Sequence, residues 1–246
     1  MNVKKLLAGL LILSYISVGA QDTNSTYDQH DLFSPNFYPS SVNEYRSADG
    51  APGPKYWTNK ASYKIQASLD DVKDEITGSV TITYTNNSPG ALSFLWLYLD
   101  ENLYNLNSRG QAKTPATGRS RYGDVNSKFE GGYNIKSVKL ISTVKGKSIE
   151  TDITNVISET RMQLRLTDPV RANGGTVSFK IDYSYFIPKY GSDRTGIQDT
   201  KNGKIYAIAQ WYPRMCVYDD IEGWNTLPYL GAGEFYLDYG DYDYTI

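Results

Sequence analysis

Histidine and cysteine are nearly absent from the sequence, which has one of each among its 246 residues, His30 and Cys216. A catalytic zinc site needs three protein ligands, and an H-E-x-x-H pair needs two histidines. This chain cannot supply such a pair, so we expect it to hold no metal ion. A single cysteine also excludes an intrachain disulfide. Because cysteine is among the most buried residue types, we interpret Cys216 as a core residue and His30 as an exposed one.

An excess of charge of either sign is also lacking, since 25 basic and 27 acidic residues are spread along the chain. Without a basic stripe, nucleic acid is not an expected partner. The sequence has no G-x-S-x-G motif and no phosphate-binding glycine loop. Carboxylates do gather near the end of the chain, at Asp219, Asp220, Asp238, Asp241 and Asp243. They fit either a glycosidase pair or solvated charges on strand edges, and we favour the second interpretation.

No apolar run is long enough to span a bilayer comfortably. The first run, residues 6–16, follows Lys4 and Lys5, and small residues occupy positions 18–20. A charged start, a short apolar run and small residues at the cleavage position are typical of a secretory signal peptide. We predict a signal peptide over residues 1–20 and an exported protein, periplasmic or extracellular, with no transmembrane segment.

Tyrosine is abundant, with 22 residues, and threonine, glycine and asparagine accompany it. Tyrosine and threonine suit a pleated, half-buried surface, and glycine and asparagine suit its turns. Apolar and polar residues alternate over 63–69, 76–84, 177–185 and 234–246, while residues 91–100 are apolar on both faces and predict a strand covered on each side. No pattern predicts a helix of three turns. We therefore predict an all-β fold of curved antiparallel sheets, sandwich-like, with no substantial helix beyond the signal peptide.

The chain divides into a polar leader over residues 21–55, rich in Ser, Asn, Asp, Pro and Gly, and one β domain over residues 56–246. A polar loop over residues 102–132 interrupts the domain and is long enough to be functional or disordered. The strand pattern continues up to Ile246 without a turn. An open, aromatic strand at a domain end invites aggregation, so we expect the chain to be a truncated fragment whose last strand lacks a partner.

Three stretches together point to a family: the hairpin YKIQASLDDVKDEITGSVTITYTN, the strand LSFLWLYLDENL, and residues 205–246, IYAIAQWYPRMCVYDDIEGWNTLPYLGAGEFYLDYGDYDYTI. They resemble the N-terminal β domain of the aminopeptidase N family of zinc metallopeptidases, the gluzincins, and the last stretch is the most specific. The resemblance implies a saddle-shaped domain that closes one side of the cleft of a thermolysin-like catalytic domain. That catalytic domain would follow Ile246 and would carry the zinc ligands.

The same resemblance implies a substrate-binding role for two residues of this chain. Gln210 matches the family glutamine at the floor of the first side-chain pocket, where its amide can donate and accept hydrogen bonds. Two positions later many members have Glu or Gln to hold the free amine, and here Tyr212 departs from that pattern. Alternation from Lys204 to Tyr212 predicts one strand that Pro213 ends, with Gln210 and Tyr212 on the same face.

Two hypotheses of different classes follow. The first is the non-catalytic N-terminal domain of an exported zinc-dependent aminopeptidase, inactive alone. Its catalytic residues and its zinc cofactor would lie in the missing part, and its partners would be a peptide substrate and the downstream catalytic domain of the same polypeptide. The alternative is a secreted carbohydrate-binding β module that uses its tyrosines as stacking platforms.

Overall fold

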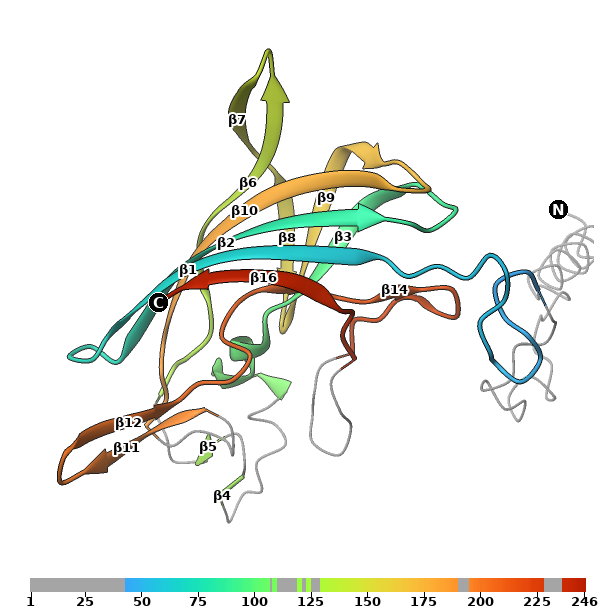
Figure 1. Cartoon of the computed structure of the whole chain (residues 1–246). Helices are drawn as coiled ribbons and strands as arrows, with labels where there is room; N and C mark the ends of the chain where they lie inside the picture. Colours follow the sequence, from blue (N-terminus) through green and yellow to red (C-terminus); the bar gives the residue numbers. More distant parts are fainter. Residues whose placement is uncertain are drawn as a thin grey trace, which may run out of the picture.

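The computed structural model describes residues 43–106, 108–109, 119–120, 123–124, 129–189, 195–227 and 236–246. The predicted signal peptide over residues 1–20 lies outside this part, as does most of the predicted leader. Two curved sheets pack face to face, so the all-β prediction is confirmed (Figure 1). Within the described residues no helix is long and apolar enough to cross a membrane.

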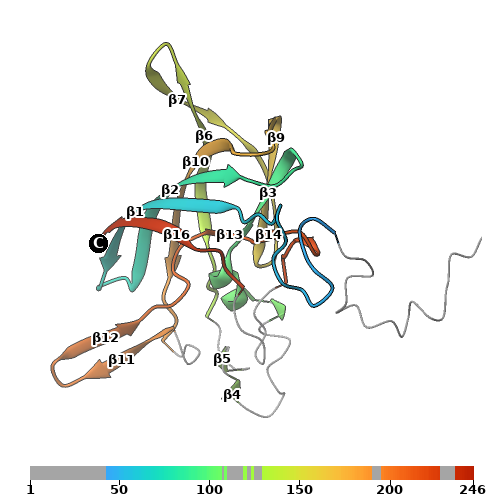
Figure 2. The ribbon, with the colours of Figure 1, turned by 45° about the vertical axis from the view of Figure 1, so that its right-hand side comes forward.

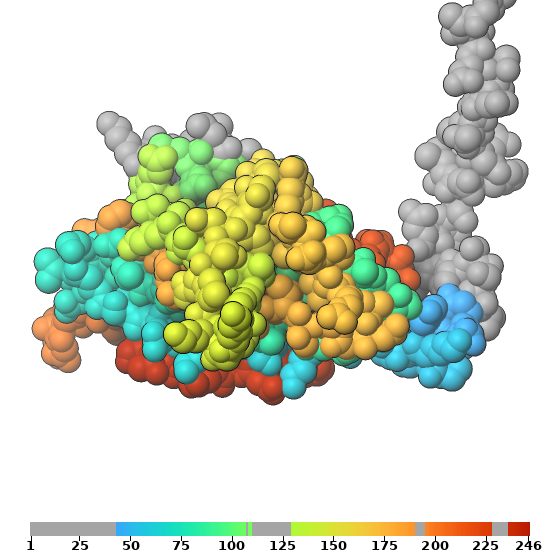
Figure 3. Space-filling model, turned by 90° about the horizontal axis from the view of Figure 1, so that it is seen from above, coloured from blue at the N-terminus to red at the C-terminus, as the bar shows by residue number. Residues whose placement is uncertain are grey.

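The larger sheet has six strands in the order β16-β1-β2-β10-β6-β7. Their bounds are β1 Lys60–Asp70, β2 Glu75–Asn86, β6 Asn134–Val144, β7 Lys147–Asp152, β10 Gly175–Phe186 and β16 Gly240–Thr245. β1 and β2 pair antiparallel from Lys60↔Thr85 to Asp70↔Glu75, which confirms the predicted hairpin. Their period-2 pattern places the apolar set on the core side of the sheet. The β6–β7 hairpin stands out from the sandwich (Figures 1 and 2), and the view from above in Figure 3 looks down on it.

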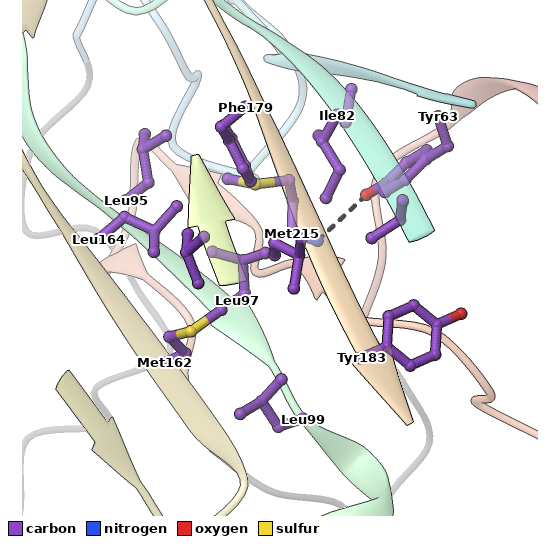
Figure 4. Close-up of a cluster of buried hydrophobic side chains, with 14 of the residues drawn as sticks. Tyr63, Ile82, Leu95, Leu97, Leu99, Met162, Leu164, Phe179, Tyr183 and Met215 are labelled. Carbon is purple, nitrogen blue, oxygen red and sulfur yellow. Dashed lines mark hydrogen bonds between the residues drawn. The ribbon is translucent and has the colours of Figure 1, made fainter. Parts of the chain in front are cut away.

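The smaller sheet has four strands in the order β13-β3-β9-β8. They are β3 Leu92–Tyr98, β8 Thr154–Ser158, β9 Arg161–Val170 and β13 Arg214–Met215. Fully buried side chains from this sheet meet those of the larger one to form the core, among them Leu95, Leu97, Met162 and Leu164 against Ile82, Phe179 and Tyr183 (Figure 4). The Tyr63 hydroxyl accepts a hydrogen bond from the backbone N–H of Met215 at 3.1 Å and so links the two sheets.

Short elements complete the fold. A 3-10 helix, Asp100–Tyr104, follows β3, and the hairpin of β11 Gly196–Thr200 and β12 Gly203–Ala207 precedes β13. Two-residue strands form the pairs β4 Arg119–Ser120 with β5 Gly123–Asp124 and β14 Tyr218–Asp219 with β15 Gly223–Trp224.

The prediction that residues 91–100 are covered on both faces is wrong for part of β3. Its core-facing leucines are buried, but Phe94 is 36% exposed and Trp96 is only half-buried. The outer face of Trp96 carries the Arg161 guanidinium, 5.6 Å from the ring centroid. The apolar residue Trp96 on the outer face of β3 is therefore covered by an arginine side chain and not by a second layer of structure.

The last strand also differs from its prediction. β16 pairs with β1 in parallel, with Tyr63 opposite Tyr242, so it has a partner and the larger sheet is mixed. The stacked rings of Tyr63 and Tyr242, 4.8 Å apart, and the Lys60–Asp241 ion pair at 2.7 Å hold it in place. β16 lies at the sheet edge, and Tyr244 and Ile246 remain 65% and 76% exposed.

Candidate functional site

The segment from Ile208 to Pro213 joins β12 to β13 and carries both residues of the predicted site. The strand expected to run through Tyr212 ends at Ala207. Gln210 has a backbone φ of 49°, in the left-handed region that no strand residue adopts. Gln210 and Tyr212 therefore do not share a strand face, and the prediction of one continuous strand is wrong.

Contacts on both sides hold the turn at Gln210. The Tyr133 hydroxyl donates a hydrogen bond to the Gln210 carbonyl oxygen at 2.9 Å. One residue earlier, the backbone N–H of Ala209 donates to Thr195 Oγ1 at 3.2 Å. Gln210 itself is half-buried, and no described residue hydrogen-bonds its side-chain amide. The backbone of Gln210 is thus fixed while its amide keeps its donor and acceptor capacity.

Tyr212 belongs to an aromatic cluster at the β1–β16 edge. Its ring meets those of Trp211, Tyr63 and Tyr242 edge-to-face, with centroids 5.1, 5.7 and 6.4 Å away. Burial raises the pKa of the Tyr212 phenol above its ordinary value, so this side chain stays neutral at physiological pH. The structure shows Tyr212 as a packing residue, and a role in substrate binding stays a prediction.

Beneath this segment lies a buried ion pair that the sequence reasoning missed. Arg214 Nε lies 2.9 Å from Asp100 Oδ2, and both side chains are 8% exposed. Burial raises the pKa of Asp100, while the charge of the neighbouring guanidinium opposes that rise. Asp100 starts the 3-10 helix directly after a buried strand. Two acidic residues directly after an apolar strand were the sequence signal that could have predicted this buried ion pair.

The 3-10 helix is connected to Gln210 through Asn102 and Tyr133. Asn102 Nδ2 donates to the Glu159 carbonyl oxygen at 2.7 Å, and Asn102 Oδ1 accepts from the backbone N–H of Tyr133 at 2.8 Å. Tyr133 in turn donates through its hydroxyl to Gln210. Asn102 is buried, whereas Tyr133 and Gln210 are half-buried, so the chain of hydrogen bonds runs from the interior towards the surface.

The β11–β12 hairpin is fastened to the turn between β1 and β2. Lys204 Nζ and the Tyr206 hydroxyl each lie 2.6 Å from Asp74 Oδ1. Hydrogen bonds from Lys204 first, and then from Tyr206, lower the pKa of Asp74. Since residue 208 follows this hairpin directly, the clamp sets the direction from which the chain enters the Gln210 turn.

The acidic residues near the end of the chain lie in different environments, although Asp219 and Asp238 remain close enough to interact. The Asp220 side chain is 7% exposed and forms a two-pronged ion pair with Arg46, with N–O distances of 2.7 and 2.8 Å, which ties part of the leader to the domain. Asp219 accepts hydrogen bonds from the backbone N–H groups of Ile221 and Glu222. Burial, and secondarily the charge of Asp219, raise the pKa of Asp238 to about 6. The solvated-edge interpretation thus fails for Asp220 but fits Asp241, whose carboxylate pairs with Lys60 on the exposed edge.

Among the described residues, no group of three or more His, Cys, Asp or Glu side chains is placed to hold a metal ion. Cys216 is fully buried, in agreement with its interpretation as a core residue. Burial also raises the pKa of its thiol well above the ordinary value, which disfavours the reactive thiolate.

No family model and no curated protein matches the sequence. The structure resembles parts of solved M1 zinc metallopeptidases. A variant of a two-domain enzyme of this kind bound to L-tryptophan overlaps 63% of this chain and 26% of its own, with a TM-score of 0.34 and 13% identity. A variant bound to L-arginine overlaps 64% of this chain and 27% of its own, with a TM-score of 0.34 and 15% identity.

A third similar structure is a variant of the M1 zinc metallopeptidase from Deinococcus radiodurans bound to a Tyr-Ser-Ala substrate. It overlaps 60% of this chain and 24% of its own, with a TM-score of 0.32 and 13% identity. The matched region thus spans about a quarter of those chains. This is a partial structural resemblance, and it assigns neither a family nor an activity to this chain.

Proposed function

We propose that this chain is the non-catalytic N-terminal β domain of an exported zinc-dependent aminopeptidase and that Gln210 contacts the peptide substrate. The placement of Gln210 carries the proposal. Residues 205–246 resemble the substrate-side segment of that family, and the glutamine stands on an anchored turn with no described partner for its amide. An amide held in this way can pair with both the N–H and the C=O of a peptide backbone.

In such an enzyme zinc activates a water molecule for attack on the first peptide carbonyl. We propose that the catalytic domain of the same polypeptide supplies the zinc ligands and that the protein works in the periplasm or outside the cell. The contribution of this domain is then to bind and orient the peptide and to exclude water from one side of the cleft. No catalytic step is assigned to its residues.

The carbohydrate-binding alternative has weaker support. Stacking platforms require exposed ring faces, and several tyrosines are instead buried in the core, among them Tyr63, Tyr84, Tyr98, Tyr104, Tyr183 and Tyr185. Tyr212 and Tyr242 pack against each other at the β1–β16 edge. The most exposed tyrosines of the described residues, Tyr239 and Tyr244, lie near the end of the chain.

The first prediction concerns the chain alone. Residues 21–246, purified and dialysed, are expected to hold no stoichiometric zinc and to cleave no aminoacyl reporter substrate, because the residues proposed to bind zinc lie in another domain. Metal analysis and a reporter assay with added zinc measure both. One tightly bound zinc ion per chain, or turnover that zinc restores, would contradict the proposal.

The second prediction concerns Gln210 in a polypeptide that also contains the catalytic domain. Gln210→Ala is expected to lower kcat/KM for peptides by about two- to twelve-fold, because a neutral hydrogen bond to substrate is worth about 0.5–1.5 kcal/mol. The melting temperature should change little. Gln198→Ala, at an exposed position of β11, is the matched control and should retain full activity. Unaltered kinetics together with a lowered melting temperature for Gln210→Ala would assign the residue to folding instead.

A further inference from the structure

Glu101 is a buried residue whose carboxyl oxygen Oε2 has no hydrogen-bond partner among the described residues. It is the second residue of the 3-10 helix and 2% exposed. Burying an ionised carboxylate there costs its hydration free energy without a compensating hydrogen bond at Oε2 or a compensating charge. Burying the neutral acid costs much less free energy. The environment therefore favours the protonated form.

Among the described residues, the groups that interact with Glu101 offer it no compensating positive charge. On its own helix, Asp100 carries a negative charge and engages the guanidinium of Arg214 from β13. Tyr185 from β10 and Tyr133 from the segment before β6 interact electrostatically with Glu101 through their phenols. Tyr183 packs edge-to-face on Tyr133 with centroids 5.5 Å apart. Burial, and then the charge of Asp100, raise the pKa of Glu101 well above its ordinary value.

The helix that holds Glu101 also holds the candidate site in place. The next residue, Asn102, links the Glu159 carbonyl to the backbone of Tyr133. The Tyr104 carbonyl at the helix end accepts from the N–H of Gly131 at 3.0 Å. Because Tyr133 donates to Gln210, displacement of the 3-10 helix would release the turn on which Gln210 stands.

We propose that Glu101 is a proton-dependent latch: its neutral form keeps the 3-10 helix docked, and its ionisation undocks the helix and frees the Gln210 turn. The latch concerns the folding of this chain and holds whether or not Gln210 binds substrate. The direction in which stability changes with pH follows from the difference between the folded-state and unfolded-state pKa values of Glu101. Because the folded-state pKa lies above the unfolded value of about 4.3, the stabilisation is complete below that value and is lost as pH rises through the folded-state pKa.

Urea unfolding of wild type and Glu101→Gln across pH 4–8 tests the latch. The wild-type ratio of folded to unfolded chain should fall about tenfold for each pH unit by which the folded-state pKa exceeds the unfolded one. Glutamine has the same shape and cannot ionise, so Glu101→Gln should lack this component. Glu150→Gln, at an exposed position of β7, is the matched control and should follow wild type. Parallel pH profiles for wild type and Glu101→Gln would overturn the proposal.

Two further measurements need only the wild-type chain. With 13C-labelled glutamate carboxyls, NMR should show one glutamate that stays protonated after the other glutamates have ionised as pH rises, because burial raises the pKa of Glu101 above the ordinary value. Hydrogen-exchange protection, corrected for intrinsic rates, should fall in residues 131–133 and 208–212 as that signal titrates. If every glutamate titrates at its ordinary pKa, or if protection in these two segments does not follow the signal, the latch does not exist.

Discussion

Replacing Arg214 with methionine is expected to destabilise the domain by about 3–5 kcal/mol, because removing one partner of a buried ion pair leaves the other charge uncompensated. Asp100, with its side chain 8% exposed, would keep its burial and lose the guanidinium 2.9 Å away. A loss of this size is a large share of the roughly 5–15 kcal/mol that stabilises a typical domain. Urea unfolding at neutral pH measures it.

Two comparisons separate the ion pair from a general effect of removing arginine. Arg165→Met, at an exposed position of β9, should be nearly neutral. The double variant Arg214→Met with Asp100→Leu should recover much of the loss, because replacing both partners by apolar groups removes the uncompensated charge. The cost of Arg214→Met should also shrink as pH falls, since protonation of Asp100 neutralises it. An equally stable Arg214→Met protein would show that the pair contributes nothing to folding.

Alternation in the sequence predicted the parts of the fold that obey a simple period. In β1, β2 and β10 one face is buried and the other is not, and a slip of one residue would expose the core face. The hairpin of β1 and β2 accordingly pairs apolar positions with one another, Tyr63 with Ile82 and Ile65 with Val80. The same alternation says nothing about which strand lies alongside, so the parallel pairing of β16 with β1 was not predictable from it.

The candidate site was harder to predict because its geometry departs from the local pattern. Residues 204–212 alternate as a strand does, yet the left-handed conformation of Gln210 breaks the strand after Ala207. That conformation is fixed by the hydroxyl of Tyr133, far away in the sequence. Asp100 ended the stretch that predicted a strand and Glu101 preceded the predicted loop, and neither pattern indicated that both side chains would be buried near Arg214 and the surrounding tyrosines.

The aromatic content likewise has a structural explanation that composition alone left open. One role of tyrosine in this fold is to fill the space that small residues leave in the sheets. Gly78 on β2 lies opposite Tyr183 on β10, and the Tyr183 ring covers the place where a side chain of residue 78 would lie. This cross-strand arrangement of glycine and aromatic ring makes a direct test of core packing.

Gly78→Ala is expected to destabilise the domain by about 1–3 kcal/mol, because an added methyl group forces a well-packed core to shift. A Cβ atom at position 78 would overlap the Cζ atom and hydroxyl oxygen of Tyr183, a fully buried residue between two neighbouring strands. The ring is fully buried and packs edge-to-face on Tyr133, so a shift of the ring would also disturb that contact. Thermal and urea unfolding of the isolated chain measure the effect.

Gly90→Ala is the matched control, because a Cβ atom there would meet nothing within 4 Å and its φ is not in the left-handed region. With no clash, alanine should be neutral or slightly stabilising through the lower entropy of the unfolded chain. Tyr183→Leu should cost less in the Gly78→Ala background than in wild type, since a smaller side chain relieves the overlap. Equal changes at positions 78 and 90, or fully additive effects of Gly78→Ala and Tyr183→Leu, would show that the ring and the glycine do not pack as a pair.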